Sequence, residues 1–309
     1  MSDALRLGLV GLGKIARDQH LPAIAATAGV ELVAIASRNA EPGPLPVFAN
    51  VEAMLANGPE IDGVVMCQPP QPRFDAARAA LAAGKHVFLE KPPGATVSEV
   101  NALVDLAAER GVTLFASWHS RYAAAVAAAR DWLAERALLR AKIAWKEDVR
   151  VWHPGQAWIF EPGGFGVFDP GINALSILTA VLGEPARVLE ARLEVPRNRQ
   201  APIAARLQMA TASGRPILAE FDFLQTGPQT WDIVLDTDRG RAVLGHGGNT
   251  LEIDGAAQPT TAEEEYPAMY RRFAELVGQR HSDVDLAPLQ LVADAFLCGR
   301  AVPTAEFHD

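Results

Sequence analysis

The stretch LRLGLVGLGKIA, residues 5–16, decides the fold of the first half of the chain. Its first part, Leu5 to Val10, is a short apolar run that predicts a buried strand. Its second part, Gly11 to Ala16, follows the pattern G-x-G-x-x-A, in which glycines permit a tight turn at the start of a helix. A strand that enters such a turn is typical of a βαβ unit whose helix N-terminus accepts a pyrophosphate, although a glycine turn without a ligand is the alternative.

The rest of the first 120 residues repeats this alternation of short apolar strands and alanine-rich helical stretches. The helical stretches include Arg73 to Ala83 and Val97 to Arg110, the second with Thr96 or Ser98 as its N-cap. The pattern predicts an α/β fold in which residues 1–120 form a doubly wound parallel sheet of the Rossmann type. The candidate strands are Leu5 to Val10, Glu31 to Ala36, Gly63 to Cys67, His86 to Leu89 and Thr113 to Ala116.

From about residue 140 apolar and polar residues alternate, and turn signals such as Ser213-Gly214 and Arg239-Gly240 separate the segments. Helical segments follow at Tyr266 to Gly278 and Pro288 to Arg300. We therefore expect residues 121–309 to form an α+β domain around a mainly antiparallel sheet, with the boundary resting on the change of period alone. The candidate strands are Leu139 to Val149, Val188 to Val195, Ile203 to Ala210, Ile217 to Phe223, Trp231 to Asp236 and Ala242 to His246.

Composition narrows the classes of partner. The 309 residues carry a net charge of -9 without a lysine or arginine run, which argues against nucleic acid as a partner. The only cysteines, Cys67 and Cys298, lack metal-ligand spacing, so we expect a reducing compartment and no metal. Neither a signal peptide nor a membrane-spanning segment is evident, and we expect a cytoplasmic protein. The second-domain sheet can mediate a homo-oligomer, but no residue pattern demonstrates one.

The ends of the predicted parallel strands carry the candidate cofactor site, because ligands bind at that edge of an open α/β sheet. Lys91 follows a buried strand, although Glu90 and Lys91 could also be two solvated charges at a strand end. The second strand ends at Ser37-Arg38 without an acid, which favours NADP over NAD while allowing both, unless Arg38 is a solvated surface residue. The residues predicted to bind the cofactor are Gly11, Gly13, Lys14, Ile15, Ser37, Arg38, Cys67, Gln68, Pro69, Glu90, Lys91 and His119.

A second group of candidates lies beyond residue 140. Asp169 and Asn173 are four residues apart and share one face if the apolar helix from Ala174 to Leu182 begins early; alternatively, Asp169 is only its N-cap. Glu147 falls on the apolar face of its strand, so it is either a sugar ligand or part of a salt bridge with Arg150 or Lys146. The residues predicted to bind a small polar substrate are Lys91, His119, Glu147, Trp152, His153, Asp169, Asn173 and Trp231, with loop or core roles as the alternative for His153 and the tryptophans.

The glycine turn, Glu90-Lys91-Pro92, and the run from Gly163 to Asn173 together resemble the Gfo/Idh/MocA oxidoreductase family over essentially the whole chain. Most members carry histidine where this chain has Asn173, and that histidine is usually assigned to proton transfer. The variant with Asn173, together with Ser37-Arg38 and the segment from Trp145 to Gln156, is similar to the aldose 1-dehydrogenases of the family. The resemblance implies oxidation of an aldopyranose, L-arabinose first and D-galactose second, at C1 to an aldonolactone.

The residues fit this chemistry. Loss of hydride from C1 of a cyclic hemiacetal requires loss of the O1 proton, and a carboxylate suffices as base because an anomeric hydroxyl is more acidic than an ordinary alcohol. We assign that role to Asp169, with Lys91 donating to O1 and Asn173 orienting either the sugar or Asp169. The alternatives are an enzyme acting on D-xylose or another aldose, a reductase working in the opposite direction, and a non-catalytic regulator that binds cofactor and sugar.

Overall fold

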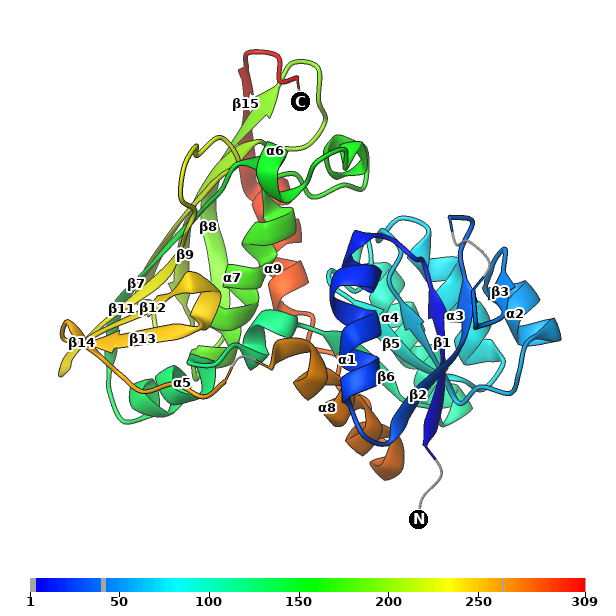
Figure 1. Cartoon of the computed structure of the whole chain (residues 1–309). Coiled ribbons are helices and arrows are strands. Elements are labelled where there is room, and N and C mark those ends of the chain that lie inside the picture. The colour runs from blue at the N-terminus through cyan, green and yellow to red at the C-terminus, as the bar shows by residue number, and fades with distance from the viewer. Residues whose placement is uncertain (1–3, 40–42, 263, 309) are drawn as a thin grey trace. The chain divides into compact units, whose positions relative to one another are not determined.

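The computed structural model describes residues 4–39, 43–262 and 264–308. The chain forms two compact units: unit 1 comprises Met1–His119 and Tyr266–Asp285, and unit 2 comprises Ser120–Glu265 and Leu286–Asp309. Figure 1 labels most of the helices and strands of both. Within the described part of the chain, no helix is both long enough and apolar enough to cross a membrane.

Unit 1 is built on a six-stranded sheet in the order β3-β2-β1-β4-β5-β6, with every neighbouring pair parallel. The order reverses between β1 and β4, which is the topological switch point of a doubly wound fold. The predicted Rossmann-type sheet is therefore confirmed. Its strands are β1 (Leu5–Val10), β2 (Val30–Ala36), β3 (Val47–Phe48), β4 (Gly63–Met66), β5 (His86–Glu90) and β6 (Leu114–Ser117).

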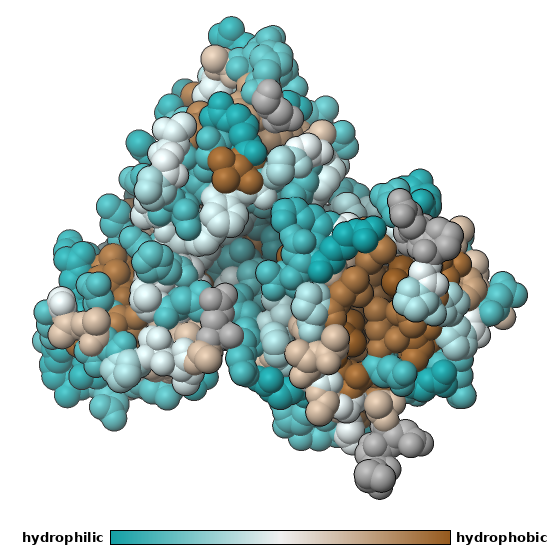
Figure 2. All heavy atoms as spheres, viewed as in Figure 1, coloured by the Kyte–Doolittle hydropathy of each residue, from teal (hydrophilic) through white to brown (hydrophobic). Residues whose placement is uncertain are grey.

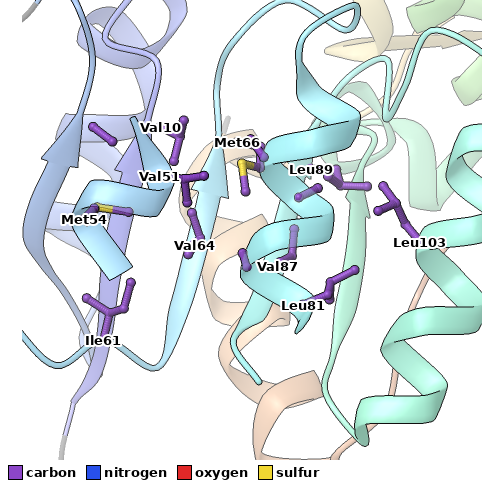
Figure 3. Close-up of a cluster of buried hydrophobic side chains, with 14 of the residues drawn as sticks. Val10, Val51, Met54, Ile61, Val64, Met66, Leu81, Val87, Leu89 and Leu103 are labelled. Atoms are coloured by element: carbon purple, nitrogen blue, oxygen red, sulfur yellow. The ribbon is translucent and has the colours of Figure 1, made fainter. Parts of the chain in front are cut away.

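The alternation of side chains along β5 explains what each face of this sheet buries. Val87 and Leu89 point into a cluster formed with α2 (Val51–Asn57), α3 (Arg73–Ala82) and α4 (Val97–Arg110), which Figure 3 shows in close-up. Phe88 points to the opposite face, where its ring packs against Phe115 and Phe273 at centroid distances of 5.2 and 5.5 Å. Because the strand is apolar on both faces, it reads as a continuous hydrophobic run.

The helices of unit 1 begin and end close to the predicted residues. Thr96 caps α4 in a capping box, since its side chain accepts from the Glu99 N–H and the Glu99 carboxylate accepts from the Thr96 N–H. Gly111 ends the same helix in the left-handed conformation, at φ 64°. The helices are the π-helical turn η1 (Ala16–His20), α1 (Leu21–Ala26), α2 (Val51–Asn57), α3 (Arg73–Ala82), α4 (Val97–Arg110) and α8 (Glu265–Gln279).

Helix α8 belongs to unit 1, although the sequence analysis placed it with residues 121–309. Its buried face carries Tyr270 and Phe273, and the Tyr270 ring stacks on Phe88 at 5.1 Å. These aromatic contacts lie more than 170 residues apart along the chain, so a boundary based on local period could not have found them. The chain passes from unit 1 to unit 2, returns to unit 1 for Tyr266–Asp285, and then enters unit 2 again with α9 (Ala287–Cys298).

The connection between β2 and β3 shows no helix in its described residues, 37–39 and 43–46. The helix α1 therefore covers only part of its face of the sheet. Figure 2 shows an apolar area on this face of unit 1, beside α1 and over β1.

Unit 2 contains a nine-stranded sheet in the order β14-β13-β12-β11-β7-β10-β9-β8-β15. Six of its neighbouring pairs are antiparallel, whereas β7 with β10 and β8 with β15 are parallel. The mainly antiparallel sheet is as predicted, but the last three strands were missed. The strands are β7 (Leu138–Lys146), β8 (Ala186–Pro196), β9 (Ala204–Thr211), β10 (Pro216–Asp222), β11 (Thr230–Thr237), β12 (Gly240–Gly245), β13 (Thr250–Ile253), β14 (Ala256–Ala257) and β15 (Gly299–Thr304).

Helices of unit 2 pack against one another and against this sheet (Figure 1). Helix α9 ends at Cys298, two residues before the predicted end, because Gly299 starts β15. A Cβ at Gly299 would lie only 2.3 Å from the Ala295 carbonyl oxygen, so the chain needs glycine to leave the helix there. The helices are α5 (Val126–Ala134), α6 (Val149–Trp152), α7 (Phe168–Val181) and α9 (Ala287–Cys298), with 3₁₀ turns at His119–Tyr122, Ala157–Phe160 and His246–Gly248.

Candidate functional site

The glycine turn after β1 has the features that a dinucleotide requires. Gly11 has φ +92°, and a Cβ there would lie 2.7 Å from the Gln68 nitrogen, so only glycine fits between the ends of β1 and β4. A Cβ at Gly13 would meet nothing within 4 Å, which leaves open space where backbone can approach a phosphate. The Arg17 N–H donates to the Gly13 carbonyl at 3.2 Å, and the helix of the first βαβ unit follows. Lys14 is exposed and pairs with Asp18, and Ile15 precedes the π-helical turn.

The end of β2 lies beside the glycine turn. Ser37 Oγ accepts hydrogen bonds from the N–H groups of Leu12 and Asn39, each at 3.2 Å. Two accepted bonds leave the hydroxyl hydrogen available to donate to a ligand oxygen. Arg38 is exposed, and Glu31 lies at the opposite end of the strand, as expected from the sequence.

Behind the next two strand ends lies Arg73, which is 2% exposed at the start of α3. Its guanidinium donates to the carbonyls of Gln68, Glu90 and Pro92. One buried side chain thus joins the loop Cys67-Gln68-Pro69 to the loop that carries Lys91. Cys67 is buried at the end of β4, whereas Pro69 is exposed.

Glu90 ends β5 on the face that carries Phe88, and it is 3% exposed. Its carboxylate accepts from Ser117 Oγ at 3.0 Å and from the Tyr266 hydroxyl at 3.2 Å. The Nε2 atom of His20, which is fully buried, lies 3.5 Å from Oε2, a distance that makes this contact an ion pair and not a well-formed hydrogen bond. His20 Nδ1 lies 2.7 Å from the Tyr270 hydroxyl.

The charges in this cluster stabilise each other. Burial lowers the pKa of His20, but the Cys67 and Glu90 side chains outweigh burial and raise it to about 10. Burial raises the pKa of Glu90, but the facing His20, with smaller contributions from His119 and Lys91, lowers it to about 2. The Glu90 carboxylate and the His20 imidazolium therefore form a charged pair at neutral pH. The alternative in which Glu90 is a solvated charge is wrong, since the side chain is buried and accepts from Tyr266 of α8.

Lys91 follows Glu90 and is half-buried at the edge of the sheet where β1, β4, β5 and β6 end. His119 follows β6, and its ring stacks on Tyr266 at a centroid distance of 5.4 Å. The candidates of unit 1 thus gather at the carboxyl ends of its parallel strands.

In unit 2 the centre of the candidate site is Glu147, one residue beyond β7 and 2% exposed. Its Oε2 accepts from the indole N–H of Trp231 at 2.8 Å, and its Oε1 lies 3.0 Å from His153 Nε2. The predicted apolar face extends through this residue, although β7 ends at Lys146 instead of Val149 because the chain turns into α6. Neither partner suggested for a salt bridge pairs with Glu147: Lys146 pairs with Glu220 at 2.8 Å and Arg150 with Asp148 at 2.9 Å, whereas the neighbour of Glu147 is His153.

His153 links Glu147 to Asp169. Its Nδ1 lies 3.7 Å from Asp169 Oδ2, so one imidazole stands between two carboxylates that are each about as buried as the core. The backbone N–H of His153 donates to the Val149 carbonyl at 2.8 Å, which holds the residue at the end of α6.

Asp169 and Asn173 lie one turn apart on α7, which begins at Phe168. Val167 is the N-cap of this helix, so the alternative in which Asp169 caps it is wrong. The preceding glycines serve close contacts within the chain, since a Cβ at Gly164 or Gly166 would lie 2.3 Å from a backbone carbonyl oxygen. Asp169 is 4% exposed, whereas Asn173 is half-buried.

The tryptophan that donates to Glu147, Trp231, packs against two others. Trp231 stacks on Trp145 at 5.8 Å and packs against Trp152 at 4.8 Å. Trp152 is 41% exposed and retains surface for a ligand. The indole N–H of Trp231 is occupied by Glu147, so this residue supports the carboxylate directly.

Sequence reasoning missed His20, Arg73 and the tyrosines of α8. One signal was present: His20 follows Ala16 by four residues and precedes Ala23 by three, which places a titratable group on a buried helical stripe. Arg73 likewise begins a stripe that continues with Ala76, Ala77 and Ala80. A polar residue on such a stripe is buried and needs partners.

Known proteins resemble this chain in sequence and in fold. The model of an oxidoreductase family with an NAD-binding Rossmann fold matches residues 5–117. The galactose 1-dehydrogenase of Pseudomonas fluorescens is 48% identical over 305 residues, covering 99% of each chain. The crystal structure of a D-galactose-1-dehydrogenase from Rhizobium etli is 53% identical, with a TM-score of 0.95 over 100% of this chain and 99% of that one. A 3-ketoreductase from Actinomadura kijaniata shares the fold at 21% identity, with a TM-score of 0.83 over 98% of this chain and 100% of that one. The chain therefore belongs to the Gfo/Idh/MocA family of oxidoreductases.

Proposed function

We propose that this protein oxidises an aldopyranose at C1 to the aldonolactone, with NADP preferred and NAD accepted as cofactor. The observation that carries the proposal is Asp169, a buried carboxylate on the first turn of α7 in a chain 48% identical over its whole length to a galactose 1-dehydrogenase. A non-catalytic regulator needs neither a base at Asp169 nor a cation at Lys91.

The substrate we propose is a sugar with the ring configuration that L-arabinose and D-galactose share at C2 to C4. The two sugars differ only at C5, so one pocket can accept both. The names of the two similar dehydrogenases support D-galactose beside the L-arabinose expected from the sequence.

For the chemistry, we assign proton removal from O1 to the Asp169 carboxylate. Lys91 donates to the same oxygen and stabilises the negative charge that develops on it. Asn173, one helical turn after Asp169, orients the sugar by hydrogen bonds and transfers no proton. A bound nicotinamide supplies the acceptor for the C1 hydride.

Trp152 offers an exposed indole face to the C–H side of the sugar, and His153 and His119 are its proposed polar neighbours. Glu147 remains a predicted sugar contact. Each of its oxygens accepts one bond from the protein, and a carboxylate oxygen can accept a second.

The residues of unit 1 fit an adenine dinucleotide. The close approach of Gly11 to Gln68 and the open space at Gly13 suit a pyrophosphate at the following helix. Ser37 has a hydroxyl hydrogen to donate, and the exposed Arg38 can pair with a 2'-phosphate. These two residues support the preference for NADP, since no acid ends β2 to hold a 2'-hydroxyl.

The decisive experiment is an initial-rate panel of D-galactose, L-arabinose, D-xylose and D-glucose with NADP and with NAD. We expect turnover with the first two sugars and a lower KM for NADP. The proposal would be falsified by a purified, folded protein that binds cofactor yet reduces it with none of these aldoses. Arg38→Ala should raise the KM for NADP about tenfold and leave that for NAD nearly unchanged, because the lost contact is a charge-assisted one. An equal rise for both cofactors would reject the role of Arg38.

A further inference from the structure

In unit 2, four side chains lie in a row from the sheet to α7, joined by two hydrogen bonds and one longer contact. The row runs from Trp231 on β11 to Glu147 after β7, then to His153 after α6, and ends at Asp169 on α7. The successive distances are 2.8 Å from Trp231 Nε1 to Glu147 Oε2, 3.0 Å from Glu147 Oε1 to His153 Nε2 and 3.7 Å from His153 Nδ1 to Asp169 Oδ2. Four separate elements thus converge on one imidazole.

The donors and acceptors in this row of side chains decide which nitrogen of His153 carries its proton. The Trp231 N–H can only donate, so it occupies Glu147 as an acceptor. An ionised Glu147 also accepts from His153, which places the proton of the neutral imidazole on Nε2. The Nδ1 lone pair therefore faces the Asp169 carboxylate at 3.7 Å, which is longer than a hydrogen bond but close enough for one to form when a proton lies between the two acceptors.

The exposures of the three side chains form a gradient. Glu147 is 2% exposed, Asp169 is 5% exposed and His153 is 15% exposed. A base as buried as Asp169 has little direct access to water, whereas the His153 side chain beside it is three times as exposed. Phe223 packs against the His153 ring at a centroid distance of 5.6 Å and limits its rotation.

We propose that His153 receives the proton that Asp169 removes from the sugar and passes it to solvent, with Glu147 as the residue that positions the imidazole. The proposal rests on the proposed function, because it takes Asp169 as the base. First the sugar O1–H bond breaks and an O–H bond forms on Asp169. That bond then breaks as an N–H bond forms at His153 Nδ1. Finally the imidazolium loses this proton to water.

The steps balance. The sugar loses one proton along this path and one hydride to the cofactor, and Asp169 and His153 both return to their starting forms. In the intermediate state the imidazolium stands between two carboxylates, which stabilises its charge. Most members of the family carry a histidine at the position of Asn173. In this protein, His153 after α6 would supply the imidazole instead.

The test measures cofactor reduction and proton release separately in a single turnover, with NADP absorbance change and a pH indicator in stopped flow. The chains compared are the unaltered protein, His153→Asn, Glu147→Gln and the control Glu220→Gln. Glu220 lies on β10 and pairs with Lys146, the neighbour of Glu147, outside the row of side chains to Asp169. Its replacement should leave both signals unchanged.

For His153→Asn we expect proton release to lag behind cofactor reduction and kcat to fall about 10- to 100-fold, as for other residues that support a catalytic group. The KM for the sugar should rise by a smaller factor than kcat falls, because His153 is also a proposed polar neighbour of the sugar. Glu147→Gln should lower kcat about tenfold and raise the solvent isotope effect on kcat, because the imidazolium loses its stabilising charge. Circular dichroism checks that each variant is folded. If His153→Asn does not fold, Glu147→Gln, which keeps the shape of the side chain, tests the relay in its place.

The failure of the relay alone and the failure of the proposed function give different results. Cofactor reduction by the unaltered protein, together with synchronous proton release and normal kcat in both variants, would overturn the relay alone. A rise in the KM of His153→Asn without a fall in kcat would also overturn the relay and leave His153 as a sugar contact alone. No cofactor reduction by the unaltered protein with any aldose would overturn the relay and the proposed function together.

Discussion

Unit 1 and unit 2 each hold an imidazole beside a buried carboxylate, but the second nitrogen of each ring meets a different neighbour. In unit 1, His20 faces Glu90 with one nitrogen and the Tyr270 hydroxyl with the other. In unit 2, His153 faces Glu147 with one nitrogen and the Asp169 carboxylate with the other.

The difference decides what each pair can do. His20 is fully buried, and its neutral tyrosine partner offers its proton no destination, so the pair is a fixed structural charge. His153 is partly exposed and stands between two carboxylates, and in the proposed relay its proton moves on to solvent. Under this proposal, similar residue types serve the stability of unit 1 and the chemistry of unit 2.

The largest expected effect is the fall in kcat on replacement of Asp169, the proposed proton acceptor in unit 2. Asp169→Asn should lower kcat by about 10²- to 10⁴-fold, the range of a general base, because the amide cannot take the O1 proton. Initial rates with D-galactose and NADP measure this, and urea unfolding should show that the fold persists. A near-normal rate would place the base elsewhere and remove the contrast between the two imidazoles.

The next effect is on stability, in unit 1. Glu90→Gln should lower the free energy of unfolding by about 3 to 5 kcal/mol, because it leaves the His20 charge buried without its partner. Glu109 is exposed at the end of α4, and Glu109→Gln is the matched control, with an expected change below about 1 kcal/mol. Urea denaturation compares them. If Glu90→Gln unfolds as readily as the control, the pair does not stabilise unit 1.

The third effect is the pH dependence of stability. The pKa of His20 is raised to about 10, so its contribution is fully present below its ordinary value of 6.5 and is lost as the pH rises towards about 10. The pKa of Glu90 is lowered to about 2, so its contribution is present above 4.5 and is lost as the pH falls towards about 2.

Urea unfolding of the unaltered protein and of His20→Phe across this range measures the difference. We expect the stability difference between the two proteins to shift in favour of the variant from pH 6.5 to pH 10, since only the unaltered protein loses a proton that stabilises its fold. A difference that does not vary with pH would mean that His20 is neutral and that the contrast with His153 is one of burial alone.

Much of unit 1 could be predicted because its strands are short apolar runs between glycine, proline and helical signals. The predicted strands differ from β1, β2, β4, β5 and β6 by no more than one residue at either end, and α4 matches its prediction at both ends. The strand β15 could not be predicted, because Gly299–Thr304 lacks an apolar alternation and pairs with β8, about a hundred residues earlier.

The candidate site was predicted in part. The position of Glu147 on an apolar face indicated a buried acid that needs a partner, and the structure agrees. The partner itself could not be read from the sequence, since Trp231 reaches Glu147 through the pairing of β7 with β11, 84 residues apart. Pairing between distant strands follows from the packing of the whole sheet and leaves no local signal.

By itself, the sequence determined the type of most elements and the residues at their ends, such as Gly11 after β1 and Lys91 after β5. These follow from local backbone preferences and from the period of apolar side chains. Only the tertiary structure decided that α8 returns to unit 1 to enclose Glu90, and that His153 lies between Glu147 and Asp169. Both depend on side chains that meet across long separations in sequence, where burial forces each polar group to find a partner.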